Sequence, residues 1–269
     1  MMSEIIQSGS NPRVKELVKL RESPRKRRER NACVVEGAED VLQFIKSGKE
    51  VLEIYYCSER VSQRKSVHLL ELWEKENYTL QPLGIDAFQK ASYRNHSDGV
   101  LAVVRTWSLK LDPEFKSEKE LVLVLDEVEK PGNLGAILRT SEALGVNLVL
   151  LSDPCVYFFN PNVIRSSRGL IAEVAVRSGT KQEVLEWMTN NDLKIFGSSS
   201  KINEPIYKQN YTLGTAFVMG NEKQGLGAFW KERLSQWCTI PMLGAASSLN
   251  LNASVACLVS EFNRRNRRH

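Results

Sequence analysis

Apolar and polar residues alternate along the second half of this chain in runs of two kinds. Strands are expected where aliphatic and β-branched residues follow one another, at 121–125, 148–151, 174–176, 193–196, 216–219 and 238–240. Helices are expected between several of these runs, at 135–144, 182–190 and 251–263. Continuous apolar strands that alternate with helices are typical of a parallel sheet covered on both faces. The pattern predicts an open, doubly wound α/β domain whose ligands bind in the loops after the strands.

The first half has the pattern of a smaller α/β unit with a basic leading segment. A helix is expected over 11–30, interrupted near Pro24; strands are expected at 33–36, 51–56 and 99–106, and helices at 38–47, 63–77 and 85–91. The polar, proline-containing segment 108–119 is the best candidate for a linker. We therefore expect an N-terminal domain at 1–107, a linker at 108–119 and a C-terminal domain at 120–269.

Charge is unevenly distributed, although the net charge is only +5. Residues 13–30 hold nine basic residues against three acidic ones, and a second basic cluster lies at 264–268. Clusters of this kind favour phosphate backbones as partners. A solvated helix face with a frayed tail would have the same composition, so charge alone leaves nucleic-acid binding open.

Composition argues against several other classes of protein. The five cysteines contain no CxxC pair, and the three histidines have no ligand spacing, so we expect reduced thiols and no metal site. The apolar runs are too short to cross a bilayer. The chain begins Met-Met-Ser-Glu, without the charged and then apolar pattern of a signal peptide, so a cytoplasmic location is expected.

The loop after the first strand of the second half leads into a helix through Pro131, Gly132 and Asn133. Leu134, Ile137, Leu138 and Leu144 of that helix have the spacing of one apolar face. Arg139 lies off this face, from where it could reach over the strand ends. An ordinary exposed arginine would occupy the same position.

Two further loops follow strands. Residues 218–227 contain three glycines but match neither a Walker loop nor GxGxxG, which argues against nucleoside triphosphates and NAD. In this loop Glu222 is a catalytic candidate or a structural cap. Residues 240–256 run from a small-residue loop into a helix expected to start near Ser248, a good N-cap. Asn250 and Asn252 are poor helix formers just inside it, which favours a functional role.

Together the three loops resemble the motifs of the SpoU/TrmH family of SPOUT RNA methyltransferases. The resemblance is carried by 131–140, by 219–226, and by 240–242 with 248–250, in the family's order and spacing. It covers about 150 residues of the chain. The first half resembles the family's RNA-binding domain more loosely, at 34–37 and 99–103. Asn252 stands where many members have serine, and Gly132 where a polar or larger residue is frequent.

The resemblance implies a SPOUT-type α/β sheet with a C-terminal trefoil knot, S-adenosylmethionine as cofactor, and methylation of a ribose 2′-hydroxyl in RNA. The family's catalytic arginine corresponds to Arg139, which we interpret as a phosphate clamp and electrostatic activator, because arginine is not readily deprotonated. Residues that position Arg139, the nucleotide and the donor would be Asn133, Glu222, Ser248 and Asn250. The cofactor would be held by backbone groups at Gly220, Ile240 and Leu249. RNA would be bound by Arg25, Lys26, Arg27 and Arg28.

Family members form homodimers through their knots, so a homodimer is expected here. Val255, Leu258 and Val259 offer an apolar helical stripe for that contact, although the same stripe could face the sheet of its own subunit. Whether Arg139 acts in its own subunit or across the dimer stays open.

Several alternatives remain at this point. Ribosomal RNA is the favoured substrate, and transfer RNA is the first alternative. A non-catalytic RNA-binding protein on the same fold is the second, although every motif residue is present. A Rossmann-type dehydrogenase is disfavoured, because the chain lacks GxGxxG and its acidic partner residue.

Overall fold

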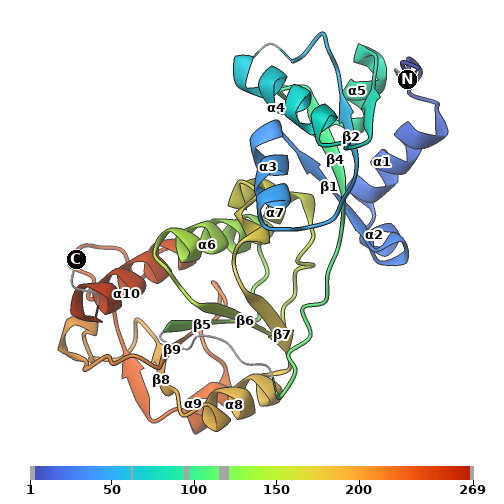
Figure 1. The fold of residues 1–269 in the computed structure, drawn as a ribbon. Coiled ribbons are helices and arrows are strands. Elements are labelled where there is room, and N and C mark those ends of the chain that lie inside the picture. The colour runs from blue at the N-terminus through green and yellow to red at the C-terminus, as the bar shows by residue number, and fades with distance from the viewer. Residues whose placement is uncertain (1–3, 62, 94–96, 115–120, 267–269) are drawn as a thin grey trace. The chain divides into compact units, whose positions relative to one another are not determined.

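The structure is a computed structural model that describes residues 4–61, 63–93, 97–114 and 121–266. Its internal contacts divide the chain into two compact units (Figure 1). The N-terminal unit consists of Met1–Trp107 and Tyr157–Glu173, and the C-terminal unit consists of Ser108–Val156 and Val174–His269. None of the helices in these described ranges is long and apolar enough to cross a membrane.

The N-terminal unit is built on a four-stranded sheet in the order β1-β4-β2-β3. The central strand β4 runs antiparallel to both of its neighbours, and β3 runs parallel to β2. The strands are β1 (Ala32–Glu36), β2 (Val51–Tyr56), β3 (Leu80–Pro82) and β4 (Val100–Arg105). The helices are α1 (Pro12–Glu22), α2 (Pro24–Arg30), α3 (Ala38–Lys46), α4 (Arg64–Lys75), α5 (Ile85–Ala91) and α7 (Pro161–Ser167), with the 3₁₀ turn η1 (Leu170–Ala172).

The basic leading segment is two helices, as its proline predicted. The Ser23 side chain accepts a hydrogen bond from the Lys26 backbone N–H and so caps α2, while Pro24 starts this helix. The guanidinium of Arg27 turns back and donates to the Leu20 and Arg21 carbonyls at 2.6 and 2.9 Å. Arg27 is therefore part of the corner between the helices, where it is 1% exposed.

The C-terminal unit is built on a six-stranded sheet in the order β10-β8-β9-β5-β6-β7, and every pairing is parallel. The strands are β5 (Leu121–Asp126), β6 (Leu148–Ser152), β7 (Val176–Gly179), β8 (Lys194–Ser198), β9 (Thr215–Met219) and β10 (Gln236–Cys238). The helices are α6 (Pro131–Ala143), α8 (Lys181–Asn190), α9 (Ala228–Arg233) and α10 (Leu251–Asn266), with the 3₁₀ turn η2 (Ile206–Lys208). The parallel α/β sheet expected from the apolar runs is confirmed.

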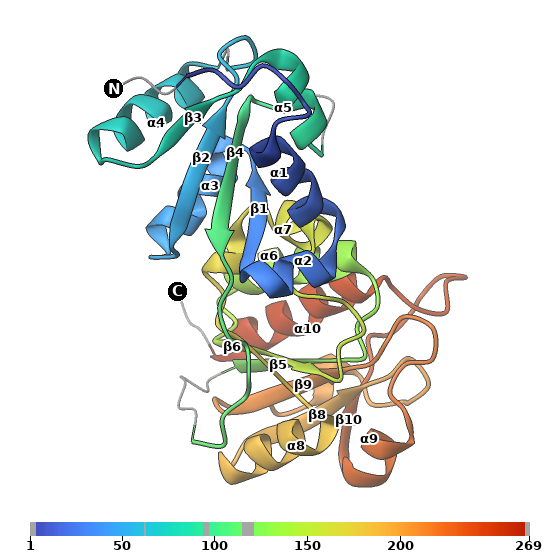
Figure 2. The same ribbon diagram turned by 90° about the vertical axis from the view of Figure 1, so that its right-hand side faces the viewer.

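Helices cover both faces of this sheet. Figures 1 and 2 show α6 and α10 on one face and α8 and α9 on the other. The central strands β5, β6 and β9 are buried along their whole length. Leu125 of β5 is paired with Met219 of β9, so the loops after these two strands leave the sheet side by side. That edge is where a parallel sheet places its ligands.

The expected linker at 108–119 is described only in its first part, because residues 115–119 lie outside the described residues. The backbone N–H of Ser178 in β7 donates to the Leu109 carbonyl at 2.6 Å. The Leu111 N–H donates to the Ser178 carbonyl at 2.9 Å, and Leu111 is buried. This stretch therefore runs along the edge strand of the C-terminal sheet.

Several expected boundaries need correction. The last helix begins at Leu251, as the range 251–263 predicted, and the alternative start near Ser248 is wrong, because the Asn250 side chain accepts the Asn252 N–H at 3.0 Å and caps the helix. The strand expected at 174–176 begins at Val176. The short helices α7 and α9 were not predicted at all.

Candidate active site

One side chain links the three loops that the sequence singled out. The Asn133 amide nitrogen, at the start of α6, donates a hydrogen bond to Oε1 of Glu222 in the loop after β9. Its amide oxygen faces Nδ2 of Asn250, the cap of α10, at 3.4 Å. Three residues from three separate loops thus form one polar network at the carboxyl edge of the sheet.

The second oxygen of Glu222 has no partner in this network. Oε2 is buried, and no hydrogen-bond donor among the described residues reaches it. A buried oxygen without a donor is costly, by about 1–3 kcal/mol or more for a charged group. Glu222 therefore presents an acceptor that a bound ligand can satisfy.

Arg139 lies on α6, two turns beyond Asn133, and its side chain is exposed. No hydrogen bond or ion pair involving this guanidinium exists within the described part of the chain. Leu134, Ile137 and Leu138 are fully buried, as the apolar stripe predicted. Arg139 thus contributes no core packing and has all its donors available for an anionic group such as a phosphate.

The loop after β9 is closed by its own backbone. A Cβ atom on Gly220 would lie 2.1 Å from the Gly225 carbonyl carbon and 2.3 Å from the Leu226 nitrogen. Gly225 has a φ of +69°, and its N–H donates to the Asn221 carbonyl at 3.0 Å. We expected Gly220 to be required by close approach of the cofactor; the structure gives a different reason, which is close approach of the loop to itself.

A second polar network fixes the loop after β9 to the end of β5 and the start of α8. Asn221 donates to Oε2 of Glu127 at 3.3 Å, and Lys181, at the start of α8, donates to the other oxygen. This hydrogen bond from Lys181 lowers the pKa of Glu127. Burial raises the pKa of the adjacent Asp126, whose Oδ1 accepts from Ser152 at 2.8 Å. Asp126, Glu127 and Lys181 were not predicted as site residues; the available signal was two adjacent acidic residues at the end of a buried parallel strand.

A groove of about 490 Å³ lies beside the end of β10. It is lined by Ser200, Lys201, Ile202, Asn203, Pro205, Tyr207, Thr239, Ile240, Pro241, Met242 and Ser247. Of the three expected cofactor residues, Ile240 is in this lining, whereas Gly220 and Leu249 are not. Ser248 is likewise outside the lining, and it is exposed. The volume falls within the range of about 300–1,000 Å³ that is typical of small-molecule sites.

The helix α10 is held against α6 within the same chain. Val255, Leu258 and Val259 are fully buried there, so the stripe that was expected to support a dimer belongs to the fold of one subunit. Thr140 of α6 donates to Oδ1 of Asn252 at 2.8 Å. The asparagine that departs from the family's frequent serine therefore joins the two helices.

The four expected RNA-binding residues are in different environments. Arg25 and Lys26 both pair with Glu29, at 2.6 and 2.7 Å. Arg27 is buried, which removes it from the surface offered to RNA. Arg28 is exposed, with its guanidinium carbon 4.7 Å from the centroid of the Tyr157 ring. We call Arg25, Lys26 and Arg28 the α2 cations.

The basic tail is only partly described, since residues 267–268 lie outside the described residues. Arg264 and Arg265 both pair with Glu261, at 2.8 and 2.7 Å. The hydrogen bond from Arg264 is the largest cause that lowers the pKa of Glu261, to about 2. The described part of the tail is thus tied to α10 by ion pairs.

Comparison with known proteins decides the family. The model of the SpoU rRNA methylase family matches residues 120–260, which include all three loops. The chain belongs to this family. The model of the MRM3-like substrate binding domain matches residues 11–102. Membership in the SpoU family confirms the RNA methyltransferase that the motifs predicted.

Curated relatives of the SpoU family cover nearly the whole chain. A 23S rRNA (guanosine(2553)-2′-O)-methyltransferase, RlmP of Bacillus subtilis, is 28% identical over 94% of this chain and 97% of its own length. A 23S rRNA (uridine(2479)-2′-O)-methyltransferase of Streptomyces viridochromogenes is 27% identical over 96% of this chain and 92% of its own.

Solved structures agree with this assignment. A crystal structure of an RNA 2′-O ribose methyltransferase has a TM-score of 0.86 and 29% identity, covering 97% of this chain and 99% of that one. The SpoU methyltransferase AviRb from Streptomyces viridochromogenes, in complex with the cofactor AdoMet, has a TM-score of 0.83 over 95% of this chain and 98% of its own. Its identity of 24% makes it a likeness of fold.

Proposed function

We propose that this protein transfers the methyl group of S-adenosylmethionine to a ribose 2′-hydroxyl of ribosomal RNA. The observation that carries the proposal is the network that joins Asn133, Glu222 and Asn250 from three separate loops. Two relatives that are 2′-O-methyltransferases of 23S rRNA support the choice of substrate. A protein with a ribosomal RNA substrate would act in the cytoplasm, where we place it.

The groove beside β10 fits the methyl donor. Tyr207 is 53% exposed and, with Ile240 and Met242, offers apolar surface for an adenine ring. Lys201 supplies a positive charge for a carboxylate at the same groove. When bound, S-adenosylmethionine supplies an electrophilic methyl group. We also assign backbone groups at Gly220 and Leu249 to holding the donor, and we assign their loops to a C-terminal trefoil knot.

The protein's own residues then orient the acceptor. Arg139, exposed and without an anionic partner among the described residues, binds a phosphate of the RNA and stabilises the negative charge that develops on the 2′-oxygen. A guanidinium keeps its proton, so this role is electrostatic. Asn250 holds Asn133, which in turn holds Glu222, whose free oxygen accepts a hydrogen bond from the bound ligand. Ser248 is accessible on the loop before α10 for a further contact.

We propose the division of labour that the sequence suggested. The N-terminal domain at 1–107 recognises the RNA, with the α2 cations contacting phosphates, and the catalytic domain at 120–269 follows the linker at 108–119. Within the latter range, Tyr157–Glu173 belongs to the N-terminal unit by its contacts. The match of residues 11–102 to a substrate binding domain supports this division.

We also propose a homodimer, now on a different surface. Leu243 is 99% exposed and Leu249 is 40% exposed on the same loop, where a second copy would cover them. Light scattering of the purified protein at micromolar concentration should give a mass of two chains, and Leu243→Asp should shift it toward one. A monomer in both cases would contradict the dimer.

Transfer of labelled methyl groups tests the activity. The protein is incubated with labelled S-adenosylmethionine and with RNA separated into ribosomal and transfer fractions from a strain without the gene. Label in ribosomal RNA is expected, and it should be absent with Arg139→Ala. Label only in transfer RNA would identify the alternative substrate. Tight donor binding without label in either fraction would identify a non-catalytic RNA-binding protein.

A further inference from the structure

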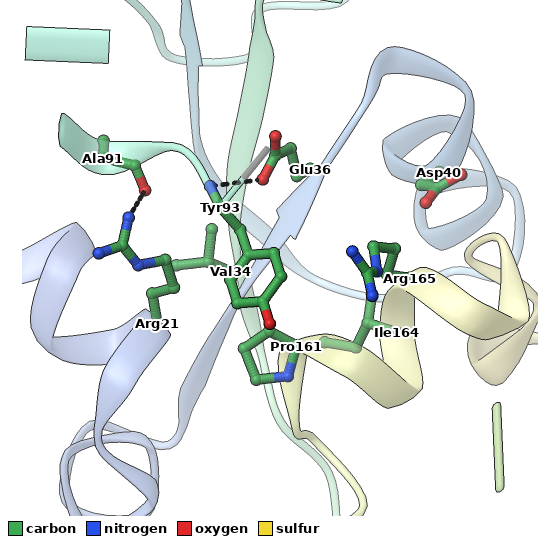
Figure 3. A pocket seen from close by; sticks show the side chains of 9 residues that line it. All are labelled: Arg21, Val34, Glu36, Asp40, Ala91, Tyr93, Pro161, Ile164 and Arg165. Atoms are coloured by element: carbon green, nitrogen blue, oxygen red, sulfur yellow. Dashed lines mark hydrogen bonds between the residues drawn. The ribbon is translucent and has the colours of Figure 1, made fainter. Parts of the chain in front are cut away.

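A groove of about 460 Å³ lies in the N-terminal unit, between the α1–α2 corner and the start of α7. Its lining includes Arg21, Tyr93, Asn160 and Pro161. A smaller cavity of about 20 Å³ shares Arg21, Tyr93 and Pro161 with it. Figure 3 shows Tyr93 in the middle of this site, with Arg21 on one side and Arg165 on the other. The volume is within the range that accommodates a small organic group such as a nucleotide.

Two exposed arginines of the N-terminal unit lie against aromatic rings. The guanidinium carbon of Arg165, in α7, is 5.2 Å from the Tyr93 ring centroid. Arg28 makes the equivalent contact with Tyr157 at 4.7 Å. In the described ranges no carboxylate lies within 4.0 Å of either guanidinium. Aromatic rings interleaved with unpaired arginines are the surface that unpaired nucleic acid binds.

The backbone of Tyr93 is fixed, although its ring is exposed. The Tyr93 N–H donates to Oε2 of Glu36 at 2.8 Å (Figure 3). The Ser92 hydroxyl donates to Oε1 of the same carboxylate at 2.7 Å. Arg21 donates to the carbonyls of Lys90 and Ser92 just before it. Tyr93 as a residue is nonetheless 46% exposed, so these bonds hold it at the surface rather than in the core.

We propose that this groove, together with the smaller cavity that Arg165 lines, binds one unpaired nucleotide of the RNA substrate, with the base stacked on Tyr93 and a neighbouring phosphate bound by Arg165. The inference rests on the proposed function, because it takes RNA as the substrate. An unpaired nucleotide fits better than a duplex, because a duplex keeps its base faces stacked inside the helix and offers none to a tyrosine ring.

RNA titrations of the full chain test whether the groove binds an unpaired nucleotide. The probes are a fluorescein-labelled single-stranded RNA 12-mer and the same strand in a duplex. Tyr93→Ala should weaken single-strand binding by about ten-fold or more, since base stacking on a ring is lost. Tyr93→Phe should bind almost as the wild type does. The duplex should bind equally well to all three proteins.

Salt dependence separates the roles of the two side chains. Arg165→Gln should reduce the slope of log affinity against log salt by about 0.7, the value for one phosphate contact on a single strand. Tyr93→Ala should leave the slope unchanged, because it removes no charge. Arg64→Gln, at the exposed first residue of α4, removes the same charge elsewhere in the unit and should change neither affinity nor slope.

Unchanged single-strand affinity of a folded Tyr93→Ala variant, or an equal loss on the duplex, would overturn the proposal. Thermal melts establish folding. In methyl transfer, Tyr93→Ala should raise KM for RNA with kcat and donor affinity unchanged; a fall in kcat alone would also count against the groove. If the wild-type protein methylates no RNA, the proposed function fails, while the 12-mer titration still decides whether the groove binds nucleotides.

Discussion

Adding one methyl group at Gly220 should disrupt the loop after β9. The Cβ of Gly220→Ala would lie 2.1 Å from the carbonyl carbon of Gly225 and 2.4 Å from its oxygen. These are backbone atoms, so no side-chain rotation relieves the clash and the loop must open. Because Glu222 sits in this loop, its hydrogen bond with Asn133 should be lost as well.

The clash should lower both the stability of the protein and its rate of methyl transfer. Overpacking costs about 1–3 kcal/mol of stability. In a chain of this size each kcal/mol lowers Tm by about 2–4 °C, so Tm should fall by about 2–12 °C. Loss of an organised polar contact at the reacting group lowers the rate by about a hundred-fold or more. Gly220→Ala should therefore lose far more activity than its modest fall in Tm would explain.

Gly227→Ala and Gly244→Ala are matched controls. A Cβ at either position would meet nothing within 4 Å, and neither residue has a positive φ. Both variants should melt near the wild-type temperature, or slightly above it, because alanine restricts the unfolded chain. Thermal melts and initial rates of methyl transfer are measured on all four proteins. A Gly220→Ala variant that behaves like the controls would refute the loop geometry.

Three further outcomes are expected. Arg139→Ala should lower methyl transfer by about a hundred- to a thousand-fold, while its thermal melt stays close to that of the wild type. Arg139→Lys should restore little of the activity, because lysine lacks the planar fork of the guanidinium. Near-normal turnover by Arg139→Ala would contradict the assignment. Replacing the α2 cations by glutamine should reduce the salt slope of RNA binding by about two, with donor titrations unchanged, whereas an equal slope would make α2 a solvated surface. Because the pKa of folded Glu261 is about 2, against an ordinary value of 4.5, its stabilising contribution is complete above about pH 4.5 and is lost as pH falls through the folded pKa. In urea unfolding the advantage of the wild type over Glu261→Gln should therefore shrink as pH falls from about 5 to about 2, and a constant difference would exclude this ion-pair effect.

The sequence predicted the fold best where burial is continuous. The strands β5, β6 and β9 are buried along their whole length, so an unbroken apolar run was enough to place them. The helices α7 and α9 have only seven and six residues, fewer than the two turns over which helical spacing becomes visible. Their existence depends on tertiary contacts that the local pattern does not contain.

The motifs predicted the residues that meet in the polar network, but not the residues that hydrogen-bond to the loop after β9. Asn133, Glu222 and Asn250 meet as the motifs implied, although they are separated by 89 and 117 positions in the chain. Lys181 and Glu127, 54 positions apart, gave no local signal of their contact. A run of basic residues does not show which of its members faces inward, so the burial of Arg27 could not be foreseen.

Identification of the methylated nucleoside tests the central claim most directly. Ribosomal RNA methylated by the purified protein is digested to nucleosides, and the new product is identified by mass spectrometry. Methyl transfer to the 2′-hydroxyl predicts one ribose-methylated nucleoside, absent when Arg139→Ala replaces the wild-type protein. A product methylated on its base, or the same ribose-methylated nucleoside formed at an equal rate by Arg139→Ala, would contradict the account.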